Sequence, residues 1–176
     1  MPFLDNLDEV SKAIGAVNTI VFDEDGTTTG YNTDYIGFQK SIDPMVTAEI
    51  EAALVLGTGG ASKAVVYALH KMGIETQYVS RKKGPNNLTY DDITDLILKG
   101  HKLIVNCTPL GTHPNILEKP NLNYDQLTSK HILFDLIYNP TETAFMKAGK
   151  KAGALVANGE NMLVEQAETS WRLWNM

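Results

Sequence analysis

The fold is decided by one stretch, Leu54-Val55-Leu56-Gly57-Thr58-Gly59-Gly60-Ala61-Ser62, in which a short apolar run breaks into glycines and then into a helix-forming segment. Gly57 permits a tight turn, Gly59 lets the backbone approach a pyrophosphate, and the helix that begins at Gly60 offers free N–H groups to an anion. Ser62 occupies the position of the usual third glycine and is small enough for close packing of helix and strand. The stretch predicts a dinucleotide-binding turn.

The end of the following strand bears on which dinucleotide is bound. A site for NAD usually carries an acid about 20 residues after the glycines, where it holds the ribose 2′-hydroxyl. Here the predicted strand at residues 76–79 runs instead into Ser80-Arg81-Lys82-Lys83. Cations at this point suit a 2′-phosphate, because charge-assisted hydrogen bonds to phosphate are strong. The sequence therefore predicts NADP as the cofactor.

The glycines allow two other interpretations. A glycine that follows a strand is often only a turn residue, and the loop alone leaves that interpretation open. The phosphate loop of nucleoside triphosphatases needs Gly-Lys-Ser/Thr, whereas this chain has Ser62-Lys63-Ala64. We exclude the triphosphatase loop, because residue 64 has no hydroxyl group to hold magnesium.

Length, composition and charge narrow the class of protein. The 176 residues suffice for one domain and part of a second, and the hydrophobic content of 43% is that of a globular protein. Apolar runs fall short of the ~20 residues of a membrane helix, and residues 1–6 lack the pattern of a signal peptide. A formal net charge of −6 argues against a nucleic-acid partner. We expect a cytoplasmic protein with no membrane partner.

The cysteine and histidine content predicts neither a disulfide nor a metal site. Cys107 is the single cysteine, which suits a reducing compartment, and we interpret it as a small buried apolar residue rather than a nucleophile. The four histidines have no metal-ligand spacing.

Strand and helix patterns alternate between residues 51 and 158. The predicted strands are residues 53–56, 76–79, 103–106, 132–136 and 154–157, and the predicted helices are residues 61–72, 90–98 and 143–151. Gly73, Gly100 and Gly153 stand where helix C-caps belong, and residues 108–130 form a long irregular connection. The pattern predicts an α/β fold, a Rossmann-like doubly wound parallel sheet.

The two ends of the chain do not fit this sheet. A helix at residues 8–14 precedes a predicted hairpin of residues 17–22 and 27–31, and a C-terminal helix covers residues 162–174. A lone hairpin is too small to be stable by itself. We therefore divide the chain into residues 1–33, a remnant of an N-terminal α/β substrate domain; residues 34–158, the NADP-binding domain with a first helix at 35–41; and residues 159–176, a helix that returns to the substrate domain.

Six motifs, taken together in this order and spacing, resemble shikimate dehydrogenases. They are Ala16-Val17-Asn18-Thr19, Gly30-Tyr31-Asn32-Thr33-Asp34-Tyr35-Ile36-Gly37, Gly57-Thr58-Gly59-Gly60-Ala61-Ser62, Asn106-Cys107-Thr108-Pro109, Asp135-Leu136-Ile137-Tyr138-Asn139-Pro140 and Gly159-Glu160-Asn161-Met162-Leu163-Val164-Glu165-Gln166. The resemblance covers essentially the whole chain. It implies an enzyme of aromatic amino-acid biosynthesis that reduces 3-dehydroshikimate to shikimate with NADPH, in a cleft between a substrate domain and an NADP domain.

The resemblance also implies roles for individual residues. Asp34 matches the aspartate of a catalytic Lys–Asp pair and a substrate-binding position, and Asn18, Tyr138 and Gln166 match further substrate-binding positions. The implied cofactor-binding residues are Gly57, Thr58, Gly59, Gly60, Ala61, Ser80, Arg81, Leu136 and Gly159. The family more often has Asn at position 80 and Thr at position 82.

The residues by themselves leave other roles open. Carbonyl reduction needs an acid within ~3 Å of the developing alkoxide, and a polyhydroxy acid needs several hydrogen-bonding groups. Asp34 could supply the first, or it could be the N-cap of the helix that follows it. Asn18 could instead cap or turn the hairpin, Gln166 could be a solvent-facing helix residue, and Asp135 could be a turn or cap residue.

Two family elements are absent from this sequence: Ser-x-Ser and Asn-Val-Thr-x-Pro-x-Lys, which supplies the catalytic lysine. We therefore expect a truncated chain that binds NADP(H) but reduces 3-dehydroshikimate poorly or not at all. Two alternatives stay open, a quinate/shikimate dehydrogenase and a non-catalytic NADP-binding sensor; Arg81 argues against the NAD-using members of the first. The hairpin edge is compatible with a homodimer.

Overall fold

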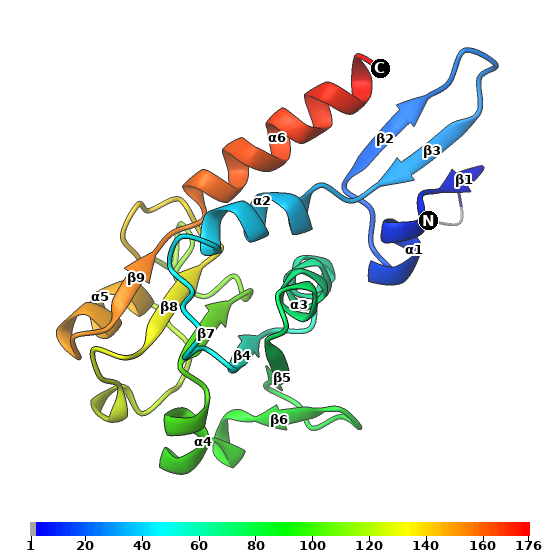
Figure 1. Ribbon diagram of the computed structural model, residues 1–176. Helices are drawn as coiled ribbons and strands as arrows, with labels where there is room; N and C mark the ends of the chain where they lie inside the picture. The colour runs from blue at the N-terminus through cyan, green and yellow to red at the C-terminus, as the bar shows by residue number, and fades with distance from the viewer. Residues whose placement is uncertain (1–2) are drawn as a thin grey trace.

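The computed structural model describes residues 3–176, and its centre is a six-stranded parallel sheet (Figure 1). The strand order is β6-β5-β4-β7-β8-β9, so that the order reverses between β4 and β7. Open α/β sheets bind ligands at such a reversal, outside the carboxyl ends of the strands. The strands are β4 (Ala52–Leu56), β5 (Glu75–Ser80), β6 (Asn87–Thr89), β7 (Leu103–Asn106), β8 (Ile132–Asp135) and β9 (Leu155–Ala157).

Helices cover both faces of the large sheet. The helices α2 (Asp34–Ile42), α3 (Gly60–Lys71) and α6 (Glu160–Trp174) lie on one face, and α4 (Asp95–Gly100) and α5 (Ala144–Lys151) lie on the other. Successive residues of a strand point to opposite faces, so Ala53 and Val55 pack against the first group and Leu54 and Leu56 against the second. This explains why β4 is apolar throughout and why its residues 53–56 are fully buried.

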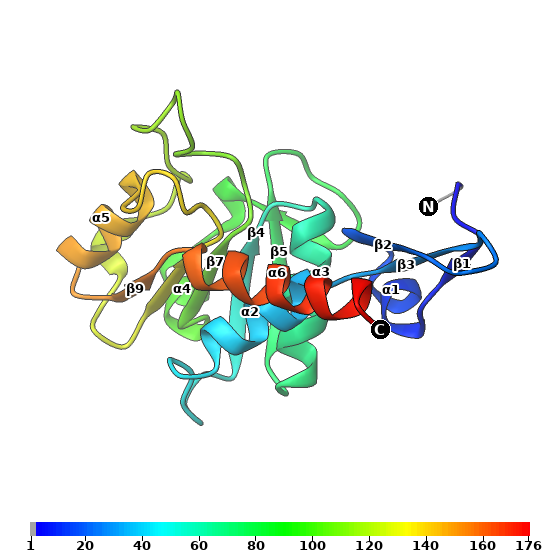
Figure 2. The ribbon, with the colours of Figure 1, turned by 90° about the horizontal axis from the view of Figure 1, so that it is seen from above.

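A second, smaller sheet projects beside the large one (Figure 2). It contains β1 (Asn6–Leu7), β3 (Thr28–Tyr31) and β2 (Thr19–Phe22) in that order; β1 is parallel to β3, and β2 is antiparallel to it. The short helix α1 (Glu9–Ile14) connects β1 to β2. The far end of α6 reaches this sheet, where Nε1 of Trp174 donates to the carbonyl of Ile20 at 2.9 Å. The C-terminal helix therefore returns to the hairpin.

The predicted α/β class and parallel sheet are confirmed, with differences at particular elements. Residues 90–98 do not form one helix: a 3₁₀ turn, η1 (Tyr90–Asp92), is separated from α4 by Ile93 in an extended conformation. Thr94 then caps α4 by accepting from the N–H of Ile97. Gly100 is the last residue of α4 rather than a cap, whereas Gly73 and Gly153 have the positive φ of C-cap glycines. The short strands β1 and β6 were not predicted.

Residues 108–130 are irregular as expected, apart from a second 3₁₀ turn, η2 (Tyr124–Gln126). Within residues 3–176, every helix is too short or too polar to cross a membrane. The domain boundaries after residues 33 and 158 stay a prediction.

Candidate functional site

The glycine loop between β4 and α3 is built to receive an anion. Gly57 has φ +105°, and a Cβ there would lie 3.1 Å from the carbonyl oxygen of Cys107. Gly59 is the N-cap of α3, and a Cβ on it would meet no atom within 4 Å, so its outer side is open. The first turn of α3, where Gly60 is the first residue, has no acidic side chain. The free N–H groups of this turn therefore face open space without a competing carboxylate.

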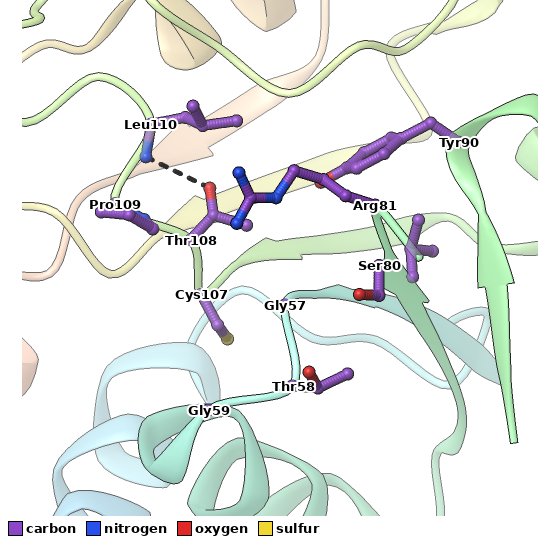
Figure 3. A pocket seen from close by; sticks show the side chains of 11 residues that line it. Gly57, Thr58, Gly59, Ser80, Arg81, Tyr90, Cys107, Thr108, Pro109 and Leu110 are labelled. Atoms are coloured by element: carbon purple, nitrogen blue, oxygen red, sulfur yellow. Dashed lines mark hydrogen bonds between the residues drawn. The ribbon is translucent and has the colours of Figure 1, made fainter. Parts of the chain in front are cut away.

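The first cavity, of about 270 Å³, lies at the carboxyl ends of β4, β5 and β7 (Figure 3). Its lining contains five predicted cofactor residues, Gly57, Thr58, Gly59, Ser80 and Arg81; the other lining residues are Val79, Tyr90, Cys107, Thr108, Pro109 and Leu110. Figure 3 shows the side chain of Arg81 extending from the end of β5 toward Thr108. The cavity thus brings the N-terminus of α3 and the guanidinium group of Arg81 together beside the reversal point of the sheet.

The basic residues 81–83 after β5 do not all face the first cavity. Nζ of Lys83 lies 2.7 Å from Oδ2 of Asp92, and the hydrogen bond from Lys83 lowers the pKa of Asp92 to about 2. The charge of Lys83 is therefore already paired. Within residues 3–176, Arg81 is the one lysine or arginine that lines this cavity. The predicted cationic cluster reduces to this single residue.

A second cavity, of about 360 Å³, collects the predicted substrate residues. Asn18, Asp34, Tyr138 and Gln166 all line it, together with the predicted cofactor residues Ala61, Leu136 and Gly159 and with Met162 and Leu163. Asn18 immediately precedes β2, Asp34 is the first residue of α2, and Gln166 lies in α6. Residues from both ends of the chain meet here because α6 packs against α2 and returns to the hairpin.

The carboxylate of Asp34 is held by the side chain of Asn18. Nδ2 of Asn18 donates to Oδ1 of Asp34 at 2.8 Å, and Oδ1 of Asn18 accepts from the backbone N–H of Thr33 at 2.8 Å. The N-cap of α2 is Thr33, so the alternative role of Asp34 as N-cap is wrong. Burial raises the pKa of Asp34, and the bond from Asn18 opposes this. Burial and the bond from Asn18 thus shift the pKa of this carboxyl group in opposite directions, and burial has the larger effect.

Gln166 faces the same residues rather than solvent alone. Its side chain is half-buried, its Oε1 accepts from Oγ1 of Thr33 at 3.4 Å, and its Nε2 donates to the carbonyl of Leu163 at 3.0 Å. Gly37 makes this approach possible, since a Cβ there would lie 2.6 Å from the carbonyl oxygen of Met162. Tyr138 stands at the rim and is 51% exposed.

A third cavity, of about 540 Å³, joins the first two. It shares Cys107, Thr108 and Pro109 with the first cavity, and Ala61, Leu136 and Tyr138 with the second. The three form one trough, called the cofactor trough below, from Arg81 at one end to Asp34 at the other. Cys107 is half-buried in it, more open than predicted, and burial raises the pKa of its thiol.

Comparison with known proteins identifies the family. A curated shikimate dehydrogenase (NADP(+)) from Methanosphaera stadtmanae is 35% identical over 191 residues, which cover 99% of this chain and 67% of the relative. The chain belongs to the shikimate dehydrogenase family. Relatives of the same name are between 33% and 40% identical. The solved shikimate dehydrogenase of Aquifex aeolicus matches with a TM-score of 0.85 and 34% identity, over 99% of this chain and 67% of that one.

The same fold also occurs in an enzyme named for another substrate. A quinate dehydrogenase from Corynebacterium glutamicum, solved in complex with NAD, matches with a TM-score of 0.85 and 28% identity, over 99% of this chain and 67% of that one. A scan against models of protein families finds no match. The fold of the shikimate dehydrogenase family is thus shared by proteins with different cofactors, and the choice depends on side chains.

This member of the shikimate dehydrogenase family contains a buried network that the sequence did not predict. Asp135, fully buried at the end of β8, accepts from Nδ2 of Asn106 at 2.9 Å, from the N–H of Ile137 and from Oγ1 of Thr143. Oδ1 of Asn106 accepts from both the N–H and Oγ1 of Thr108. Burial raises the pKa of Asp135 to about 6 despite these donors.

The network links two loops of the cofactor trough. One is the loop after β7 with Thr108, and the other is the loop after β8 with Ile137 and Tyr138. The signal in the sequence was the spacing of Asn106 and Thr108, which is typical of an Asn side chain that bonds to the backbone two residues on. The bond from the N–H of Ile137 agrees with the turn role that the sequence leaves open for Asp135, and the bonds from Asn106 and Thr143 also tie the end of β8 to β7 and to the start of α5.

Proposed function

We propose that this chain binds NADP(H) along the cofactor trough and presents it to 3-dehydroshikimate, as an NADP-dependent shikimate dehydrogenase. The observation that carries the proposal is the continuity of the trough, which has an anion-binding glycine loop and Arg81 at one end and the Asn18–Asp34–Gln166 group at the other. A dinucleotide has an adenosine half and a nicotinamide half, and the two ends of the trough could each receive one of them. The residue types fit the cofactor, since a Cβ on Gly59 would meet no atom within 4 Å and the backbone at this point of the loop is open to a pyrophosphate.

The trough gives the cofactor one direction. Arg81 and Ser80 would hold the ribose 2′-phosphate, and the N–H groups at residues 57–60 would hold the pyrophosphate. Ala61, Leu136 and Gly159 would then line the nicotinamide end. Gly159 packs closely against Leu136 in this lining, because a Cβ on it would collide with the carbonyl oxygen of Leu136. The bound cofactor would supply the hydride.

The second cavity would supply the proton and hold the substrate. Asp34 is proposed as the catalytic residue, since burial raises the pKa of its carboxyl group and the hydrogen bond from Asn18 fixes its orientation. Asn18, Gln166 and Tyr138 would bond to the hydroxyl and carboxylate groups of the substrate. Within residues 3–176 the lining contains no lysine, and we therefore propose slow turnover.

The alternatives, a quinate-using enzyme and an NADP sensor, differ in what the second cavity binds. A sensor needs no polyhydroxy acid site, whereas Asn18, Asp34 and Gln166 here converge on one cavity. Adding shikimate or quinate to the complex with NADPH distinguishes the three candidates. The proposed enzyme binds shikimate more tightly than quinate, a quinate-using enzyme binds quinate at least as tightly as shikimate, and a sensor binds neither. A cytoplasmic location and a homodimer stay predictions.

The cofactor choice is tested by titrating NADPH and NADH at fixed salt, with Arg81→Ala beside Lys82→Ala. Loss of a charge-assisted contact is worth roughly 1.5–3 kcal/mol, so we expect Arg81→Ala to weaken NADPH binding about tenfold to a hundredfold and to leave NADH binding unchanged. Lys82 lies outside the lining and serves as the matched cation control. Equal dissociation constants of the wild type for NADPH and NADH would overturn the proposal.

A further inference from the structure

One wall of the first cavity is formed by a side chain that no motif predicted. Tyr90, half-buried in η1, lines the cavity beside Arg81 (Figure 3). Burial raises the pKa of Tyr90, so its phenol stays uncharged at neutral pH. The loop of Pro109 and Leu110 lines the same cavity from the end of β7, at the other side of the reversal point. The cavity therefore has an aromatic ring on one side and apolar groups on the other.

A single carboxylate fixes the position of Tyr90. Oδ2 of Asp92 accepts from the N–H of Thr89 at 2.8 Å, from Oγ1 of Thr89 at 3.0 Å and from Nζ of Lys83 at 2.7 Å. Thr89 is the last residue of β6, and Lys83 belongs to the loop that leaves β5. These bonds close the loop of residues 83–92 and leave Tyr90 at the first position of the turn. The ring of Tyr90 thus lies in the part of the loop that the hydrogen bonds of Asp92 hold in place.

We propose that Tyr90 is a cofactor-binding residue that packs against the adenine of the cofactor, and that Asp92 is the positioning residue that holds it there. The inference rests on the proposed function. Adenine is flat and aromatic, and a tyrosine ring offers it a face for stacking without any charge. Arg81 lies next to the ring, so the adenine and the 2′-phosphate would be held by neighbouring side chains of one wall. The pairing of Lys83 with Asp92 then orders this wall instead of binding phosphate.

Binding of each half of the cofactor, measured separately, distinguishes a contact between Tyr90 and adenine from a general loss of structure. The probes are adenosine 2′,5′-bisphosphate, which carries the adenine, and reduced nicotinamide mononucleotide, which does not. We expect Tyr90→Ala to weaken binding of the bisphosphate and of NADPH about tenfold, since stacking of a base on an aromatic side chain is of this order. Binding of the mononucleotide should stay unchanged. Tyr90→Phe should restore wild-type affinity, and Tyr90→Leu, which fills similar space without an aromatic face, should restore only part.

Tyr31→Ala is the matched control, because Tyr31 is a half-buried tyrosine in β3 that lines none of the three cavities of the trough. It should leave binding of the bisphosphate unchanged. If Tyr90→Ala binds the bisphosphate as the wild type does, or loses both halves of the cofactor equally, the role of Tyr90 is wrong. If the wild type binds neither NADPH nor the bisphosphate, the proposed function itself fails.

Asp92→Asn tests the positioning role. It keeps the shape of the side chain but removes the charge that pairs with Lys83, so Tyr90 should be held less firmly and the bisphosphate bound about threefold to fivefold more weakly. In a chain that already carries Tyr90→Ala, Asp92→Asn should have no further effect. An equal loss in both backgrounds, or tighter binding because Lys83 becomes free for the phosphate, would overturn the role of Asp92.

Discussion

The large and the small sheet are held together by different interactions. In the large sheet, residues 53–56 of β4 are fully buried between helices on both faces. In the small sheet, β2 leaves Ile20 40% and Phe22 76% exposed, and among residues 3–31 only Ile14 belongs to the buried apolar core. The large sheet therefore depends on apolar burial, and the small one depends on hydrogen bonds. The loops that line the first cavity follow strands of the large sheet, which is the more deeply buried of the two sheets.

A cluster of buried hydroxyl groups ties the small sheet to the rest of the chain. Oγ of Ser170 lies 2.7 Å from Oγ1 of Thr19 in β2 and 3.0 Å from Oγ1 of Thr33 before α2. Asn18, which orients Asp34, is adjacent in the chain to Thr19 and bonds to Thr33. The substrate end of the cofactor trough thus depends on polar contacts between the small sheet and the helices of the large one. Within residues 3–176, the cofactor end is formed by the large sheet and its loops alone.

The largest expected effect comes from opening the core of the large sheet. Phe134 in β8 is fully buried and meets the ring of Phe38 edge to face, with centroids 5.2 Å apart. Phe134→Ala should lower the free energy of unfolding by about 3–5 kcal/mol, through lost burial and the cavity left behind. Urea unfolding measures this. Phe22→Ala is the control in the small sheet and should cost below about 0.5 kcal/mol; equal losses would remove the contrast between the sheets.

A second effect concerns the charge buried in the large sheet. The folded pKa of Asp135, about 6, exceeds its ordinary value of 3.8, so the folded state binds the proton more tightly than the unfolded state. Stability contributed by this group is therefore present below pH 4 and is lost as the pH rises through 6. The shift of about two units corresponds to roughly 3 kcal/mol.

Unfolding by urea between pH 4 and pH 7.5 tests this dependence. The free energy of unfolding of Asp135→Asn should lack this fall with rising pH. Asp91→Asn, at an exposed position, should keep the slope of the wild type. A wild-type protein whose stability rises across this range, with the slope unchanged in Asp135→Asn, would show that the three donors outweigh burial.

The large sheet was predictable because its signals are local. The apolar run of residues 53–56 ends at Gly57 and lies in a strand that is covered on both faces. Tyr90 was placed in the wrong element, because the capping pairs Thr89–Asp92 and Thr94–Ile97 interrupt an apolar spacing that favours a helix. The partner of Lys83 could not be predicted either, since a run of cations does not show which of them meets a carboxylate after folding.

The site was predictable only in part, for a related reason. The glycine loop and Arg81 follow strands, and their neighbourhood follows from the order of a parallel sheet. The meeting of Asn18 with Gln166 depends on how α6 packs, and the motifs of the family indicated it where periodicity did not. The bond network of Asp135 joins residues 29 positions apart in the chain, and neither residue type nor spacing identifies such a partner.

The smallest expected effect lies in the hydroxyl cluster that joins the two sheets. Ser170→Ala removes the bonds to Thr19 and Thr33, but both hydroxyls keep Oδ1 of Asn18 as an acceptor, so the cost should be about 1 kcal/mol. The loss should be local: amide hydrogen exchange should accelerate in β2 and β3 and stay unchanged in β4 and β7. Because Asn18 loses part of its support, shikimate should bind more weakly while NADPH binding is kept. Thr169→Ala, one residue earlier on α6, removes a hydroxyl that, within residues 3–176, bonds only to the carbonyl of Glu165, and it should change neither. Faster exchange in β4 as well would mean that the two sheets open as one unit and that the contrast between them is only one of exposure.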